Sequence, residues 1–141
     1  MIIAGRQAIT ILFWENERHK YDLYVSQYVI DECSFGDANA AERRLNFLKN
    51  IPVIPKSELI TTLADKYQHL LCIPDRSKID CFHLAVCVIT EMDYLLSWNC
   101  THLGIQTFVK LQKYNEAKGL FTPLLLTPEA LIEFSETQEI T

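Results

Sequence analysis

Short runs of strand-forming residues alternate along this chain with longer segments of helical periodicity. The strands are expected at 22–26, 51–54, 93–98 and 121–126. The helices are expected at about 6–19, 28–33, 37–49, 57–70, 80–91 and 105–118, with another beginning near 127. This alternation is typical of an α/β fold with a parallel sheet flanked by helices on both faces. A chain of 141 residues is expected to form one domain around a single core.

Composition and charge narrow the class of protein. Hydrophobic residues make up 49% and charged residues 22%, which is ordinary for a folded globular chain. We expect no membrane span, because the apolar runs are far shorter than the roughly 20 residues that a bilayer requires. The first residues do not resemble a secretory signal, so a cytoplasmic location is expected. The net charge of -5 opposes indiscriminate binding to nucleic acid but remains compatible with carboxylates that hold metal ions.

The five cysteines are an odd number and lack CxxC spacing. This argues against a disulfide framework, and we expect reduced thiols that are mostly buried. Cysteine and histidine could also form a soft-metal cluster, although the spacings match no common zinc motif. The residues of that less favoured alternative are Cys81, His83, Cys87, Cys100 and His102.

Topology sorts the acidic residues between the two rims of the expected sheet. Binding sites in such sheets form at the carboxyl ends of the strands, and Glu32, Asp80 and Asn99 are all expected there. Asp22 and Asp93 open their strands and are expected at the opposite rim. Two carboxylates with an amide oxygen suit Mg²⁺ or Mn²⁺, which could activate water for phosphodiester hydrolysis.

Each of these three residues also has a purely structural interpretation. Asp80 could cap its helix and complement the helix dipole. Glu32 could be a solvated helix residue, because glutamate is a good helix former. Asn99 could be an ordinary turn residue after a strand. Their expected convergence at one rim favours the metal-binding interpretation.

Three segments in order resemble the acidic motifs of the PIN domain family. The second motif is similar to Val25-Ser-Gln-Tyr-Val-Ile-Asp-Glu32 and the third to Asp80-Cys-Phe-His-Leu-Ala85. The fourth resembles Asp93-Tyr-Leu-Leu-Ser-Trp-Asn-Cys-Thr-His102, and the likeness extends over about residues 3–134. The family opens with a strand that carries its first aspartate, and this chain begins almost at the helix that follows.

The resemblance implies a magnesium- or manganese-dependent endoribonuclease like the VapC toxins. Glu32 and Asp80 would be metal ligands, and Asn99 would position a ligand or a water molecule. The implied partners are an RNA substrate, a cognate antitoxin protein and a second copy in a homodimer. The alternative is a PIN module that cuts nothing and binds an antitoxin or itself. A third interpretation, an unrelated doubly wound ligand-binding domain, lacks a Gly-rich phosphate loop.

Two cations lie in the loop just before Asp80. Contacts to RNA phosphates require lysine or arginine. Arg76 and Lys78 are the expected RNA-binding residues, because they lie next to the predicted metal site. Most of the other basic residues are expected on solvated helix faces.

Overall fold

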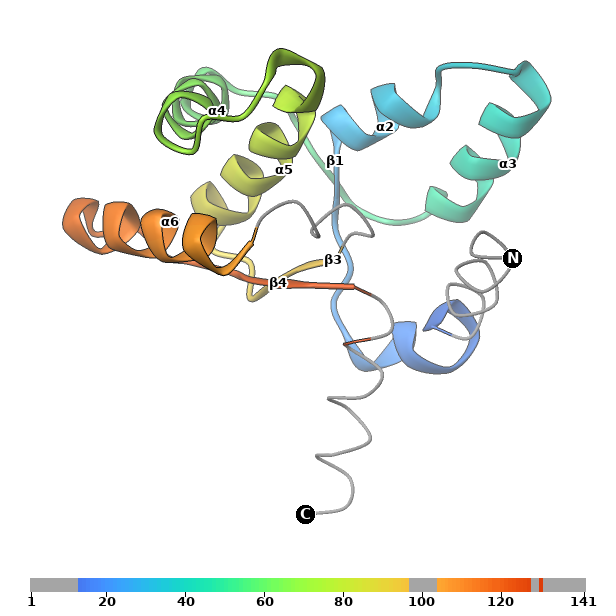
Figure 1. Cartoon of the computed structure of the whole chain (residues 1–141). Coiled ribbons are helices and arrows are strands. Elements are labelled where there is room, and N and C mark those ends of the chain that lie inside the picture. Colours follow the sequence, from blue (N-terminus) through green and yellow to red (C-terminus); the bar gives the residue numbers. More distant parts are fainter. Residues whose placement is uncertain (1–12, 97–103, 128–129, 131–141) are drawn as a thin grey trace.

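The computed structural model describes residues 13–96, 104–127 and 130 (Figure 1). Five helices dominate this part of the chain: α2 (Gln27–Cys33), α3 (Ala38–Leu48), α4 (Glu58–Leu70), α5 (Lys78–Ile89) and α6 (Ile105–Lys118). Three single turns are η1 (Phe13–Glu17), η2 (Arg18–Lys20) and η3 (Asp75–Ser77). The strands are β1 (Val25–Ser26), β2 (Val53–Ile54), β3 (Tyr94–Leu96) and β4 (Leu124–Leu126).

The four strands form two separate parallel pairs. β1 pairs with β2, with Val25 opposite Val53, and β3 pairs with β4, with Tyr94 opposite Leu124. Within the described residues, no strand joins the two pairs into one sheet. The expected α/β fold, a PIN-like parallel sheet with helices on both faces, is therefore wrong for this structure. The chain is mostly helical, with two small sheets.

Local chemistry explains why the strands are shorter than the sequence predicts. Proline has no amide to donate to a neighbouring strand, so β2 begins only after Pro52 and β4 only after Pro123. The expected strand 22–26 shrinks to Val25–Ser26, where the Val25 amide donates to the Pro52 carbonyl at 3.0 Å. Two or three paired residues cannot form a broad sheet.

The hydrophobic core lies mainly between α4 and α5. Helix α4 begins at its N-cap Ser57, whose hydroxyl accepts from the Ile60 amide at 3.2 Å. Its buried residues, Ile60, Leu63, Ala64 and Tyr67, recur at helical spacing and form one apolar face. Each fully buried large apolar side chain stabilises the fold by about 1.5–3 kcal/mol. The packing of α4 on α5 therefore fixes the orientation of α5.

Helix α5 is apolar on several sides because other elements cover it. Its buried residues are Cys81, Leu84, Ala85, Val86, Cys87 and Val88. Helix α4 covers part of α5, while α2 lies near its amino-terminal end (Figure 1). The polar residues at that end, Asp80 and His83, therefore lie near the junction of α2 and α5.

Helix α6 ends at Gly119, which adopts a left-handed conformation with φ +69°. Glycine is favoured there because it lacks a Cβ atom. The next amide, that of Leu120, donates to the Asn115 carbonyl at 2.8 Å. This turn directs the chain back toward β4.

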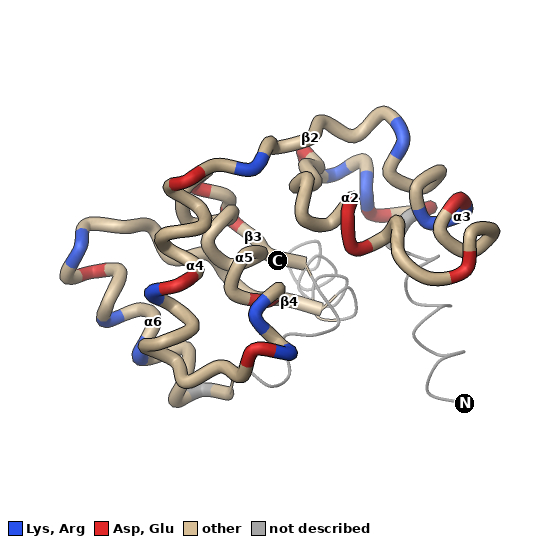
Figure 2. The backbone as a smooth tube through the Cα atoms, turned by 90° about the horizontal axis from the view of Figure 1, so that it is seen from above, with Lys and Arg blue, Asp and Glu red and all other residues tan. Residues whose placement is uncertain are grey.

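Charged residues are distributed over several elements. Acidic and basic positions are interspersed along α3, α4 and α6 (Figure 2). Among the described residues, no helix is both long and apolar enough to cross a membrane.

Candidate functional site

The candidate site lies where α2 meets α5. Ser26 is the N-cap of α2, and its hydroxyl accepts a hydrogen bond from the Val29 amide at 3.2 Å. Glu32 follows in the last turn of this seven-residue helix. Its Oε1 atom lies 3.8 Å from Nε2 of His83 on α5. This distance is too long for a hydrogen bond and corresponds to an ion pair when His83 is protonated.

The two side chains of this pair differ in exposure. The Glu32 side chain is 48% exposed, whereas that of His83 is 12% exposed. The interaction with His83 lowers the pKa of Glu32, and this effect outweighs the desolvation that would raise it. Glu32 is therefore held as a carboxylate, the form that binds a cation.

Asp80 lies one turn before His83 on α5. Residues three apart on a helix are neighbours on its surface, so Asp80 lies on the same side of α5 as His83, whose side chain contacts Glu32 on α2. Burial raises the pKa of the Cys81 thiol to about 11, and the negative charge of Asp80 makes a smaller contribution in the same direction. Asp80 is half-buried. Glu32 and His83 are thus in contact across the junction of α2 and α5, and Asp80 lies one helical turn away on α5.

These side chains do not form a ready-made metal centre. In the described part of the chain, no group of three or more His, Cys, Asp and Glu residues could hold a metal ion. Glu32 and Asp80 can supply two carboxylates. Mg²⁺ commonly binds one or two carboxylates together with water and substrate phosphates. The donor types present therefore fit a hard divalent ion that keeps most of its water ligands.

The remaining predicted site residues are placed differently. Asn99 lies outside the described residues, as do Cys100 and His102 of the alternative cluster. Arg76 is exposed in η3. Lys78 turns toward α4, where its Nζ lies 2.8 Å from Asp65 Oδ1, and its ammonium group lies 5.9 Å from the centre of the Phe82 ring. An RNA phosphate would have to compete with Asp65 for Lys78.

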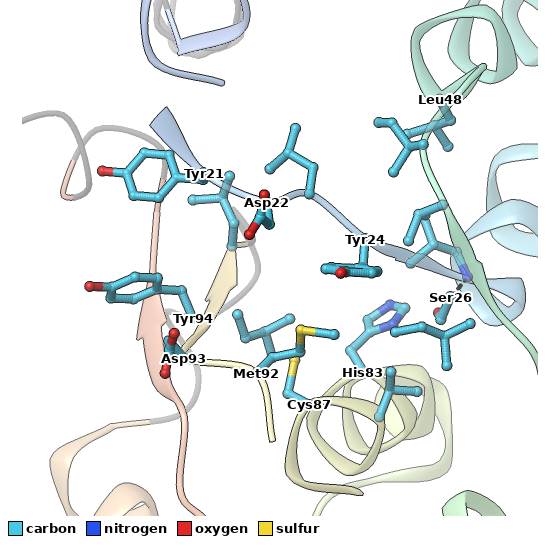
Figure 3. A pocket seen from close by; sticks show the side chains of 18 of the residues that line it. Tyr21, Asp22, Tyr24, Ser26, Leu48, His83, Cys87, Met92, Asp93 and Tyr94 are labelled. Carbon is cyan, nitrogen blue, oxygen red and sulfur yellow. Dashed lines mark hydrogen bonds between the residues drawn. The ribbon is translucent and has the colours of Figure 1, made fainter. Parts of the chain in front are cut away.

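A pocket of about 670 Å³ adjoins the Glu32–His83 pair. Figure 3 shows Tyr24, Ser26 and His83 around one end of it, and Tyr21, Asp22, Asp93 and Tyr94 around the other. The Nδ1 atom of His83 is buried and has no hydrogen-bond partner in the described structure.

The pocket brings together residues that the sequence assigns to opposite rims. Asp22 and Asp93 were expected on the far side of the sheet from Glu32, yet all three residues line this pocket. The expected rims belong to one continuous sheet, whereas the structure has two separate strand pairs with the pocket beside both.

Sequence reasoning placed His83 in the less favoured soft-metal cluster and did not pair it with Glu32. The available signal was the three-residue spacing from Asp80, which places His83 on the same helix face. The contact with Glu32 depends on how α2 packs on α5, and that packing has no local sequence signature.

Comparisons of this chain with protein-family models, with curated proteins and with solved structures find no match.

Proposed function

We propose that this protein is a metal-dependent hydrolase of RNA phosphodiester bonds, with Glu32 and Asp80 as the metal ligands. The observation that carries the proposal is the 3.8 Å contact between Glu32 on α2 and His83 on α5, with Asp80 one helical turn before His83. The resemblance of the segments around Glu32 and Asp80 to the acidic motifs of PIN ribonucleases supports the same chemistry.

Each residue has a defined task in this proposal. When bound, Mg²⁺ or Mn²⁺ would activate water and stabilise the charge that develops on the phosphate. Glu32 and Asp80 provide the oxygen ligands and the negative charge. His83 orients Glu32 through their 3.8 Å contact and favours its ionised form. The exposed Arg76 is available for an RNA phosphate next to Asp80.

The test measures cleavage of a fluorescently labelled single-stranded RNA with Mg²⁺ and with EDTA. Glu32→Gln and Asp80→Asn keep the size of each side chain and remove its charge. We expect the cleavage rate of each variant to fall by more than about 100-fold. Removing a group that only supports a metal ligand typically costs up to about 100-fold, so a larger loss indicates a ligand. Glu116→Gln is the matched control, because Glu116 is exposed on α6 and outside the site. Cleavage that persists in EDTA, or equal losses in all three variants, contradicts the proposal.

A second function, protein binding without catalysis, is favoured by one observation. Among the described residues, no group of three or more His, Cys, Asp and Glu side chains could hold a metal ion without further ligands from water or substrate. If the folded wild-type protein binds neither Mg²⁺ nor Mn²⁺ and cleaves no RNA, the hydrolase proposal is wrong and protein binding becomes the favoured function.

A further inference from the structure

The 670 Å³ pocket borders the edges of two strands. Three consecutive residues at β1, Tyr24, Val25 and Ser26, line it, and so do the three residues of β3. Successive side chains of a strand point to opposite faces of its sheet. A pocket that touches every residue along a strand therefore lies beside the strand edge and does not merely cover one face.

The hydrogen bonds show which peptide groups face this edge. The Val25 amide donates to the Pro52 carbonyl, so the main chain of Val25 faces β2. In a parallel pair the neighbouring residues direct their peptide groups to the opposite side, which places the Tyr24 peptide and the Ser26 amide on the edge away from β2. In the described structure, no backbone hydrogen bond links β1 to β3.

The same pattern holds in the second pair. The Leu124 amide donates to the Asp93 carbonyl at 2.9 Å, and Tyr94 lies opposite Leu124 in the register. Asp93 and Leu95 thus direct their peptide groups toward β4, whereas Tyr94 and Leu96 direct theirs away from it. Among residues 13–96, 104–127 and 130, both pairs therefore have an edge available for another strand.

The pocket combines an apolar interior with an acidic rim. Side chains from α2, β2, α5, β3 and the turn between α5 and β3 form the interior, including Val29, Ile54, Val86, Met92 and Leu95. Asp22, Glu91 and Asp93 are exposed at the rim, in addition to Glu32. Lys20, the one lysine among the described lining residues, lies 3.1 Å from Glu17, which offsets its charge. An apolar segment with basic ends complements this surface.

We propose that this pocket receives an extended, basic segment of a partner polypeptide, which adds a β-strand to the edges of β1 and β3. Such a segment would satisfy the peptide groups of Tyr24 and Ser26 on one side and those of Tyr94 and Leu96 on the other. Its alternate side chains would enter the apolar interior, and its Lys or Arg residues would meet the acidic rim. This inference goes beyond the proposed hydrolysis and does not depend on it.

The two edges need not be coplanar to accept one strand. Neighbouring strands are rotated by about 20–25° relative to each other, so the rotation accumulates across an inserted strand. Tyr21 and Tyr94 form an edge-to-face pair with ring centres 6.1 Å apart, which brings the two walls together at one end of the pocket. The side chains on α5, including His83 and Cys87, form the base (Figure 3).

The experiment uses the full chain and a short synthetic peptide of alternating valine and threonine with lysine at both ends. Calorimetry measures its affinity, and hydrogen exchange followed by NMR measures protection of the amides of Tyr24, Ser26, Tyr94 and Leu96. We expect binding and protection of these amides only when the peptide is present. Two control peptides carry proline at alternate positions or glutamate at both ends, and neither should bind with comparable affinity.

The acidic rim is tested by the double variant Asp22→Lys with Asp93→Lys. Because both substitutions replace an exposed negative charge with a positive one, they should weaken the binding of the lysine-ended peptide by about tenfold. Glu116→Lys makes the same type of charge change on α6, away from the pocket, and should leave the affinity within about twofold.

Several results would overturn this inference. Equal binding of the proline-containing peptide would show that main-chain pairing is not involved. Protection of the four amides without peptide would mean that this chain itself fills the pocket. Protection that rises with protein concentration alone would assign the pocket to a second copy of the chain. Absence of binding by the lysine-ended peptide would also overturn it.

Discussion

Replacing Tyr67 by phenylalanine removes a hydroxyl group from a fully buried hydrogen bond between α4 and α6. The Tyr67 hydroxyl donates to Asn115 Oδ1 at 2.5 Å, and both residues are 0% exposed. Asn115 Nδ2 in turn donates to Thr122 Oγ1 at 3.0 Å. The network therefore connects α4, α6 and the segment before β4. Burial raises the pKa of Tyr67 well above its usual range, so the hydroxyl stays protonated and remains a donor.

The expected cost follows from what the substitution leaves behind. Tyr67→Phe strands the buried Asn115 Oδ1 without its donor, and an unsatisfied buried polar group costs about 1–3 kcal/mol. For a chain of this length, each kcal/mol lowers Tm by about 2–4 °C. Urea unfolding followed by circular dichroism should show a lower midpoint with an unchanged slope.

Tyr28→Phe is the matched control. Tyr28 is 7% exposed, and its hydroxyl is buried without a hydrogen-bond partner among the described residues. Removing this hydroxyl leaves no protein group unpaired, so the variant should be neutral or slightly more stable. Equal destabilisation by Tyr67→Phe and Tyr28→Phe would refute the reasoning, because the structure assigns a partner to only one of the two hydroxyls.

Three further substitutions test separate features. The contact with His83 lowers the pKa of Glu32 below 4.5, so its stabilisation is present above that pH and is lost as the pH falls through the folded-state value. The stability difference between wild type and Glu32→Gln should therefore shrink as the pH falls below 4.5, and a widening difference in urea titrations would contradict this assignment. Gly119→Ala should cost about 1 kcal/mol in unfolding experiments, because a left-handed φ strains alanine although nothing lies within 4 Å of its Cβ. Lys78→Met should leave the urea midpoint of unfolding nearly unchanged, since its ion pair with Asp65 is largely exposed, and a clear loss would show that Lys78 has an additional structural role.

The helices could be predicted from the sequence because their signals are local. The periodicity from Ser57 predicts a helix at 57–70, and the structure has Glu58–Leu70 with Ser57 as its cap. The helix expected at 105–118 is confirmed as Ile105–Lys118, and Gly119 ends it. Each prediction depends on a cap, a stop and a repeating apolar face within one segment.

The sheet could not be predicted correctly, because strand pairing depends on contacts between distant segments. The runs at 51–54 and 121–126 have strand-like composition, but Pro52 and Pro123 limit how far each can pair. The prediction of one continuous sheet assumed that all the strands lie next to one another. The structure has two separate strand pairs instead.

The candidate site was predicted only in part. Glu32 and Asp80 were selected by topology and stay a prediction; the structure places Glu32 in contact with His83, which sequence reasoning did not assign to the site. Lys78 was expected near an RNA phosphate because of its position in the sequence, but its side chain contacts Asp65 on α4. The direction of a long side chain depends on the neighbouring helix, and the linear sequence does not reveal it.

The most direct test of the proposed metal-dependent hydrolase is the binding of Mn²⁺ measured by isothermal titration calorimetry. The proposal predicts that wild type binds the ion and that binding is lost in Glu32→Gln and in Asp80→Asn. It also predicts that Glu116→Gln, which changes an exposed acid on α6, binds as wild type does. Absence of binding by the folded wild type, or undiminished binding by both site variants, would contradict a metal site at Glu32 and Asp80.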